Sequence, residues 1–153
     1  MAQGGQIVVT GRGDATLEGA MRALAARHPG HVGVRIGFEE GEARRLYAGS
    51  DFLLMPSRFE PCGLSQMYAQ RYGSLPVAHR TGGLADTIDD NVTGFLFGDL
   101  SLHGLMDAVT RALGSYASKG VLSRMRRRAM RRPPNWMKSS RRYSALYETL
   151  MAG

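Results

Sequence analysis

Residues 51–66 read DFLLMPSRFEPCGLSQ, an apolar run that passes through a polar elbow into a helical pattern. The apolar run ends at Met55 and predicts a strand, while the helical spacing begins at Gly63, continues to Tyr72 and stops at Gly73. This order of strand, loop and helix puts the carboxylate of Glu60 just before free backbone N–H groups at a helix N-terminus. Because phosphate binds readily to such groups, the stretch predicts an anion site.

Strands and helices alternate on both sides of this stretch. Apolar and β-branched runs predict strands at 7–10, 32–36, 51–55, 75–78 and 94–97. The connections between them are too long for hairpins, which indicates a parallel sheet covered on both faces. We therefore predict a doubly wound α/β fold with about five strands. An all-helical segment follows residue 102 and ends in a helix over 136–150.

Length and composition limit the class of protein. A chain of 153 residues with 43% hydrophobic residues is expected to form a single domain over 1–153. No apolar run is long enough to span a membrane, and the first residues lack the pattern of a secretion signal. The single cysteine, Cys62, excludes an intrachain disulfide and fits a reducing compartment. We therefore expect a cytoplasmic location.

Most of the net charge of +7 comes from the C-terminal region. Residues 1–110 carry 9 basic and 12 acidic side chains, whereas residues 111–153 carry 11 basic and 1 acidic. The densest basic run lies between Arg124 and Arg132 and could contact phosphates or another polyanion. A solvated helix face is the simpler interpretation. The spacing of the four histidines predicts no metal site.

Four polar or glycine-rich segments follow the predicted strands, at 11–14, 37–40, 57–65 and 79–83. In an open parallel sheet, ligands bind beyond the carboxyl ends of the strands, so we expect these segments to meet there. Their convergence is a stronger argument than any one of them. The first segment, for example, lacks the third glycine of a dinucleotide fingerprint.

Residues 56–66, 72–77 and 80–87 resemble the C-terminal lobe of bacterial glycogen synthases and plant starch synthases. These are retaining glucosyltransferases of the two-lobed GT-B fold, which use ADP-glucose or UDP-glucose as donor. The resemblance covers nearly the whole chain. It implies a Rossmann-like, nucleotide-sugar-binding lobe that needs no cofactor besides its substrate, in the cytoplasm or, for a plant starch synthase, in a plastid.

The resemblance implies a role for each matching residue. Glu60 matches the first acid of the Glu-x7-Glu motif and is expected beside the donor sugar as the catalytic residue. The backbone of 62–65 matches the turn that cradles the diphosphate, and Phe38 matches the aromatic position that packs on the nucleobase. The predicted donor-binding residues are Gly11, Gly13, Phe38, Arg58, Cys62, Gly63, Leu64, Ser65, Thr81, Gly82 and Gly83.

The sequence departs from the family pattern in two respects. Tyr68 stands where the generic motif has its second acid, a substitution familiar in the glycogen synthase branch. The N-terminal acceptor lobe, with its lysine-containing glycine-rich loop, and an upstream arginine and lysine pair are not among the 153 residues. We therefore expect a donor-binding lobe that meets its α-1,4-glucan acceptor only through the other lobe and is inactive alone.

Several alternatives stay open. From spacing alone, Glu60 fits a helix-capping carboxylate, Phe38 fits a filler of a hydrophobic gap, and His79 fits a loop residue. The chain could also belong to another GT-B glycosyltransferase, or be a non-catalytic module that binds nucleic acid through 124–132; the resemblance disfavours a nucleic-acid partner. A bacterial-type motif favours ADP-glucose over UDP-glucose. The last helix offers its aromatic side chains, Trp136, Tyr143 and Tyr147, for docking against a second lobe.

Overall fold

A computed structural model describes residues 4–132 and 136–152, with the backbone alone for 136–139. The chain divides into two compact units, Met1–Leu46 and Tyr47–Gly153. The single nucleotide-sugar-binding domain expected over 1–153 stays a prediction. In the described residues, no helix is both long and apolar enough to cross a membrane.

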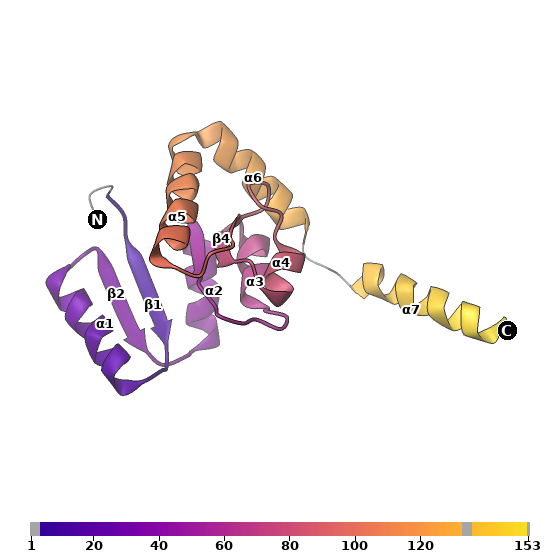
Figure 1. Cartoon of the computed structure of the whole chain (residues 1–153), viewed down its shortest axis with the longest axis horizontal. Helices are drawn as coiled ribbons and strands as arrows, with labels where there is room; N and C mark the ends of the chain where they lie inside the picture. The colour runs from indigo at the N-terminus through magenta and orange to yellow at the C-terminus, as the bar shows by residue number, and fades with distance from the viewer. Residues whose placement is uncertain (1–3, 133–135, 153) are drawn as a thin grey trace. The chain divides into compact units, whose positions relative to one another are not determined.

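The first unit holds two parallel strands, β1 (Ile7–Gly11) and β2 (Val32–Ile36), with α1 (Ala15–Arg27) between them in sequence. α1 packs against β2 (Figure 1). It begins at Asp14, whose carboxylate accepts the N–H groups of Thr16 and Leu17, as the sequence predicts. Helix α2 (Glu40–Gly49) follows β2.

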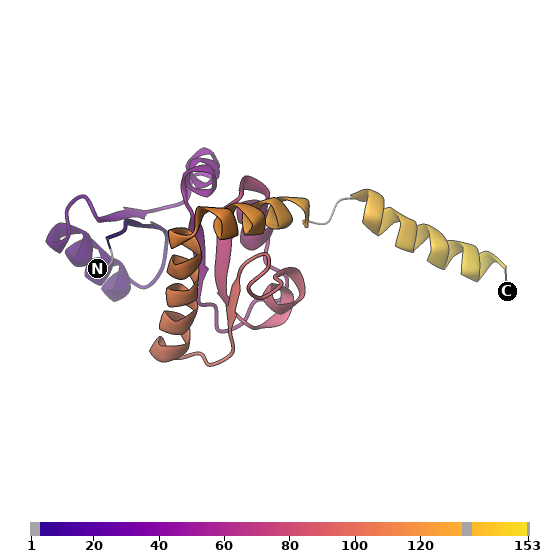
Figure 2. The same cartoon turned by 90° about the horizontal axis from the view of Figure 1, so that it is seen from above.

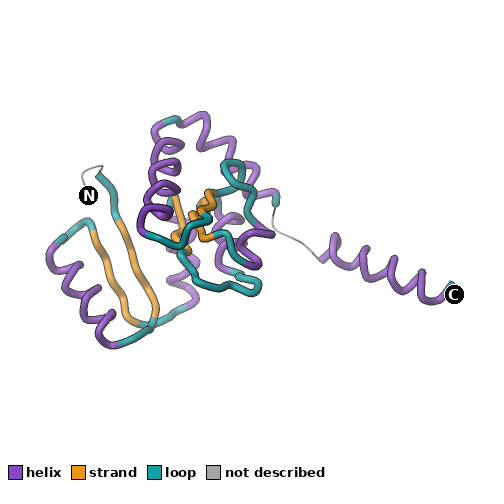
Figure 3. Tube along the Cα trace, in the orientation of Figure 1, coloured by secondary structure: helices purple, strands orange, loops and turns teal. Residues whose placement is uncertain are grey.

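The second unit is built on three parallel strands, β3 (Phe52–Met55), β4 (Leu75–His79) and β5 (Phe95–Phe97). β4 is the central strand, and Leu75 to Ala78 are fully buried. Helices α3 (Ser65–Tyr72), α4 (Gly82–Thr87), α5 (Leu102–Ala117) and α6 (Lys119–Arg131) surround the strands (Figure 3). Burial on both faces is the pattern of a parallel sheet in an α/β protein.

The core of this unit has two parts because successive strand residues face opposite sides of the sheet. The larger part joins Leu75 and Val77 of β4, and Phe95 and Phe97 of β5, to α5 and α6. Those two helices meet at a corner, which Figure 2 shows from above. The smaller part forms on the other face, from Ala78, Leu84, Ile88 and Leu96.

The last helix, α7 (Trp136–Met151), carries an exposed set of large side chains. The exposed residues are Tyr143, Leu146, Tyr147, Leu150 and Met151. The docking role predicted for Tyr143 and Tyr147 stays a prediction. The side chain of Trp136, predicted with them, lies outside the described residues.

The prediction of an α/β fold with about five parallel strands is confirmed, and the strands are paired in two sheets of two and three strands. Each strand lies within one residue of its predicted limits. The prediction that the third helix begins at Gly63 is wrong, because Gly63 has φ 69° and α3 starts at Ser65. The sequence pattern also missed α4, which begins within the Gly82-Gly83 pair.

Candidate functional site

The polar elbow (residues 56–64), between β3 and α3, leads into a helix start with free backbone donors. Leu64 occupies the N-cap position of α3, and no side chain there accepts a hydrogen bond from the helix. Across the part of the chain that the structure describes, nothing accepts the N–H groups of Gly63, Leu64 and Ser65. These are groups that a helix N-terminus offers to an anion. The elbow therefore has the donors that the sequence predicts.

A close backbone approach holds this elbow against the start of α4. The N–H of Gly83 donates to the carbonyl oxygen of Glu60 at 2.9 Å. A Cβ atom on Gly82 would lie 2.1 Å from that same oxygen, and one on Gly83 would lie 1.9 Å from the carbonyl oxygen of Cys62. Only glycine permits two backbones to come this close. The structure thus brings predicted residues from 60–63 and 81–83 together.

The buried side chain of Gln66 also links the elbow to α4. Its Nε2 atom shares its two hydrogens among three acceptors, the carbonyl oxygens of Cys62 at 3.0 Å and Gly63 at 2.8 Å and the hydroxyl oxygen of Thr87 at 3.1 Å. The Thr87 hydroxyl in turn donates to the carbonyl oxygen of Gly83. Sequence reasoning gave Gln66 no role. Its position three residues after a glycine turn, on the face that also carries buried Ala69 and Gln70, is the signal that was missed.

His79, at the carboxyl end of β4, holds the first part of the elbow. Its Nδ1 atom lies 2.8 Å from the carbonyl oxygen of Ser57. A carbonyl oxygen can only accept, so Nδ1 carries the hydrogen in this bond. The ring also packs against Phe97, with 5.6 Å between the ring centres. His79 is therefore part of the structural support of the elbow.

Glu60 is a half-buried residue, and Arg58, two positions earlier, is exposed. In the described residues no ion pair joins these two side chains. Glu60 does not cap α3 either, because α3 has no side-chain cap. Its carboxylate is left available to a ligand.

The remaining predicted residues, Gly11, Gly13 and Phe38, belong to the first unit. The strand ends meet there, since Gly37 N–H donates to the carbonyl oxygen of Gly11 at 2.8 Å. Phe38 is 75% exposed, so it fills no hydrophobic gap within its unit. The next residue, Glu39, accepts the N–H groups of Gly41 and Glu42, and these bonds lower the pKa of its carboxyl group.

Some arginines of the basic run at 124–132 form ion pairs within the unit. Arg126 forms an ion pair with Asp51, and Arg132 forms one with Asp89, so these two arginines fix the helix to the rest of the unit. Arg124 and Arg128 are exposed on the solvent face. The structure therefore fits the solvated-face interpretation, and contact with nucleic acid through this run stays an untested alternative.

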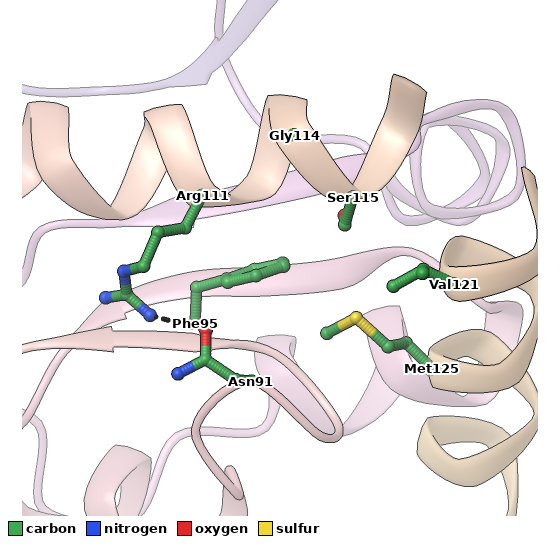
Figure 4. A pocket seen from close by; sticks show the side chains of 7 residues that line it. All are labelled: Asn91, Phe95, Arg111, Gly114, Ser115, Val121 and Met125. Carbon is green, nitrogen blue, oxygen red and sulfur yellow. Dashed lines mark hydrogen bonds between the residues drawn. The ribbon is translucent and has the colours of Figure 1, made fainter. Parts of the chain in front are cut away.

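A separate hollow of about 330 Å³ lies between α5, α6 and the turn before β5 (Figure 4). Arg111 reaches across it and donates to Asp90 at 3.0 Å and to the side chain of Asn91 at 2.7 Å. Burial alone would lower the pKa of Arg111, but hydrogen bonds to Asp90 and Asp107 outweigh it and raise that pKa. The hollow adjoins Phe95, at the amino end of β5, and no predicted site residue lines it. Its arginine therefore has a structural role.

Comparison with known proteins identifies the family. The model for glycosyl transferases group 1 matches residues 2–115, about three quarters of the chain. The chain belongs to this family. The roles predicted for its individual site residues stay predictions.

This group 1 glycosyltransferase chain has relatives that bear out the resemblance to glycogen and starch synthases. It is 59% identical to the glycogen synthase of Pseudomonas putida over 97% of the chain, and 56% identical to that of Xanthomonas oryzae pv. oryzae over 99%. It covers 29% and 30% of those proteins. The chain therefore spans about 30% of the length of the curated relatives it matches.

Solved structures agree. The catalytic domain of starch synthase IV from Arabidopsis thaliana, bound to ADP and acarbose, is 31% identical with a TM-score of 0.85, and the match covers 99% of this chain and 34% of that one. Sucrose-phosphate synthase from Thermosynechococcus elongatus has a TM-score of 0.67 at 23% identity, over 97% of this chain and 39% of the other. The second likeness shows the fold alone.

Proposed function

We propose that this chain binds the nucleotide-sugar donor of a retaining glucosyltransferase that extends the non-reducing end of an α-1,4-glucan, as a glycogen or starch synthase does. The observation that carries the proposal is the elbow. There the N–H groups of Gly63, Leu64 and Ser65 have no protein acceptor, and the carboxylate of Glu60 before them does not cap α3. The relatives support it, since they are glycogen synthases and a starch synthase structure bound to ADP and acarbose.

The chemistry of glucosyl transfer suits these groups. The bond between the sugar and the diphosphate breaks with positive charge growing at the sugar carbon and negative charge on the leaving diphosphate. The carboxylate of Glu60 stabilises the first charge, and the N–H groups of Gly63, Leu64 and Ser65 stabilise the second. Both are in place before the reaction, so little reorganisation is needed, and the loss of one such donor costs on the order of 100-fold in rate.

ADP-glucose is the donor we propose, ahead of UDP-glucose, because the motif at 56–66 is of the bacterial type. The aromatic ring of Phe38 is exposed, as a side chain that stacks on a nucleobase must be before the ligand binds. Gly11 and Gly13, at the end of β1, offer a backbone without side chains to a ligand. The ligands that we propose are substrates, and we propose no cofactor. The cytoplasmic location stays a prediction.

We also propose that this chain alone does not transfer glucose. It spans about 30% of the length of its glycogen synthase relatives, and the acceptor glucan is proposed to bind through the part it does not cover. Donor binding and turnover are then separate properties, which can be measured separately.

Calorimetric titration of the chain with ADP, ADP-glucose and UDP-glucose tests the binding. We expect weak, saturable binding, roughly millimolar, with ADP-glucose ahead of UDP-glucose. No heat at millimolar nucleotide would contradict a preformed site. A transfer assay with labelled ADP-glucose and glycogen tests the rest, and turnover within the usual range of about 1 to 1,000 per second would contradict inactivity of the chain alone.

A further inference from the structure

Gln66 makes an unusual set of contacts for a residue in the first turn of a helix. Its side chain is 0% exposed, and its amide nitrogen has three acceptors within 3.1 Å. Its Oε1 atom is buried and has no partner in the described residues. A buried polar atom without a partner costs stability, roughly 1–3 kcal/mol. The hydrogen bonds of the Nε2 atom therefore come with a cost at the Oε1 atom.

The two carbonyl groups that Gln66 binds belong to the elbow. In a planar trans peptide the C=O and N–H bonds point in opposite directions, and the described chain contains no cis peptide bond. The carbonyl of Cys62 points to Gln66, so the N–H of Gly63 in the same peptide points away from it. The carbonyl of Gly63 points to Gln66 as well, so the N–H of Leu64 also points away.

Neither of these two N–H groups has a protein acceptor in the described structure. The same amide group also reaches Thr87, whose hydroxyl group binds the carbonyl oxygen of Gly83. Gln66 therefore links the elbow to the glycine pair of α4 while turning the elbow's donors outward. Gly63 leaves room for this arrangement, because a Cβ there would lie 2.4 Å from the Gln66 Oε1 atom.

We propose that Gln66 is a positioning residue whose buried amide group orients the N–H groups of Gly63 and Leu64 toward the donor diphosphate. The identity of the ligand rests on the proposed function, whereas the orientation of the two peptides does not. Gln66 itself touches no reacting atom in this scheme. It acts through the two peptide planes.

The chain offers a matched control, Gln70, one turn later on the same helix. Gln70 is also 0% exposed and also has a buried Oε1 without a partner in the described chain. Its Nε2 atom donates to the carbonyl oxygen of Thr87 at 3.2 Å and lies 3.5 Å from Thr93, away from the elbow. Gln66→Met and Gln70→Met thus remove the same group from equally buried positions, and only the first loses contact with the elbow.

The test uses the whole chain labelled with ¹⁵N. Residual dipolar couplings report the direction of the Gly63 and Leu64 N–H bonds, and titration with inorganic pyrophosphate and with ADP reports affinity. We expect Gln66→Met to change both couplings and to weaken binding about 10-fold or more, since a hydrogen bond to a charged group contributes at least that factor. Gln70→Met should keep couplings and affinity within about twofold of the wild type while losing comparable stability.

Wild-type couplings and affinity in Gln66→Met would overturn the proposal, as would an equal loss of affinity in Gln70→Met. If Gln66→Met does not fold, the wild type still decides: couplings that direct the Gly63 and Leu64 N–H bonds away from Gln66 support the proposal, and couplings that direct them elsewhere refute it. If the wild type binds neither pyrophosphate nor ADP, the proposed function fails and the ligand assigned here fails with it, while the couplings still decide the orientation of the peptides.

Discussion

Replacing Gly83 by alanine perturbs the contact on which the elbow depends. The new Cβ would lie 1.9 Å from the carbonyl oxygen of Cys62 and 2.6 Å from its Cα, where ordinary contact begins near 3.4 Å. One of the two backbones must therefore move by about 1.5 Å. Overpacking of this kind costs about 1–3 kcal/mol, and the hydrogen bond from Gly83 to Glu60 adds about 1 kcal/mol if it breaks. We expect a loss of about 2–4 kcal/mol in the free energy of unfolding.

Urea unfolding followed by circular dichroism measures this loss, with an unchanged dependence on urea concentration as the sign that the unfolded state is unaffected. Gly114→Ala is the control, because Gly114 lies in α5 and a Cβ there meets nothing within 4 Å. Alanine in a helix should stabilise by up to about 1 kcal/mol. If Gly83→Ala stays within about 0.5 kcal/mol of the wild type, a surface-like effect, the reasoning from close approach is refuted.

Three further outcomes are expected. Arg111→Met should lower the free energy of unfolding by about 1–3 kcal/mol. This is less than the loss of a fully buried ion pair costs, because the Arg111 side chain is 29% exposed. An unchanged melting temperature would contradict a structural role for the pair of Arg111 and Asp90. The hydrogen bond from the N–H of Gly41 is the main cause of the lowered pKa of Glu39. The Glu39 carboxylate should therefore cap α2 fully above pH 4.5, and the cap should be lost as the pH falls through the lowered pKa. Amide exchange in α2 should show this loss, and Glu39→Gln should abolish the pH dependence. Asp14→Ala should cost about 1 kcal/mol in α1 and speed amide exchange in its first turn, with Asp14→Asn close to the wild type; equal exchange in all three would argue against the cap.

Local sequence signals predicted the framework of the elbow well. The apolar run before Pro56 forms β3, and Gly73 ends α3 with φ 83°, the left-handed conformation that glycine adopts readily. The helix start was misplaced because Gly63 also has a positive φ, and no spacing rule reveals which glycine of a turn will be left-handed. Local sequence signals therefore predicted the strand and the end of the helix, but not the start of the helix.

Contacts between distant segments could not be predicted in this way. The sequence shows a glycine pair at 82–83, but the need for it arises from the backbone of Glu60 and Cys62, about twenty residues earlier. Glutamine is usually exposed, and Gln66 is buried because α3 packs against other helices and strands of the unit. Both features depend on how helices and strands meet in space. They are also the features that support the elbow.

We propose that the donor diphosphate binds to the amides of Gly63, Leu64 and Ser65. An NMR titration of the ¹⁵N-labelled chain with ADP-glucose tests this most directly. We predict saturable shifts of these three amides and of Gly82 and Gly83, with the amide of Gly114 unchanged. Saturable shifts confined to residues outside 57–65 and 79–83, or no shifts at millimolar ADP-glucose, would contradict donor binding at the elbow.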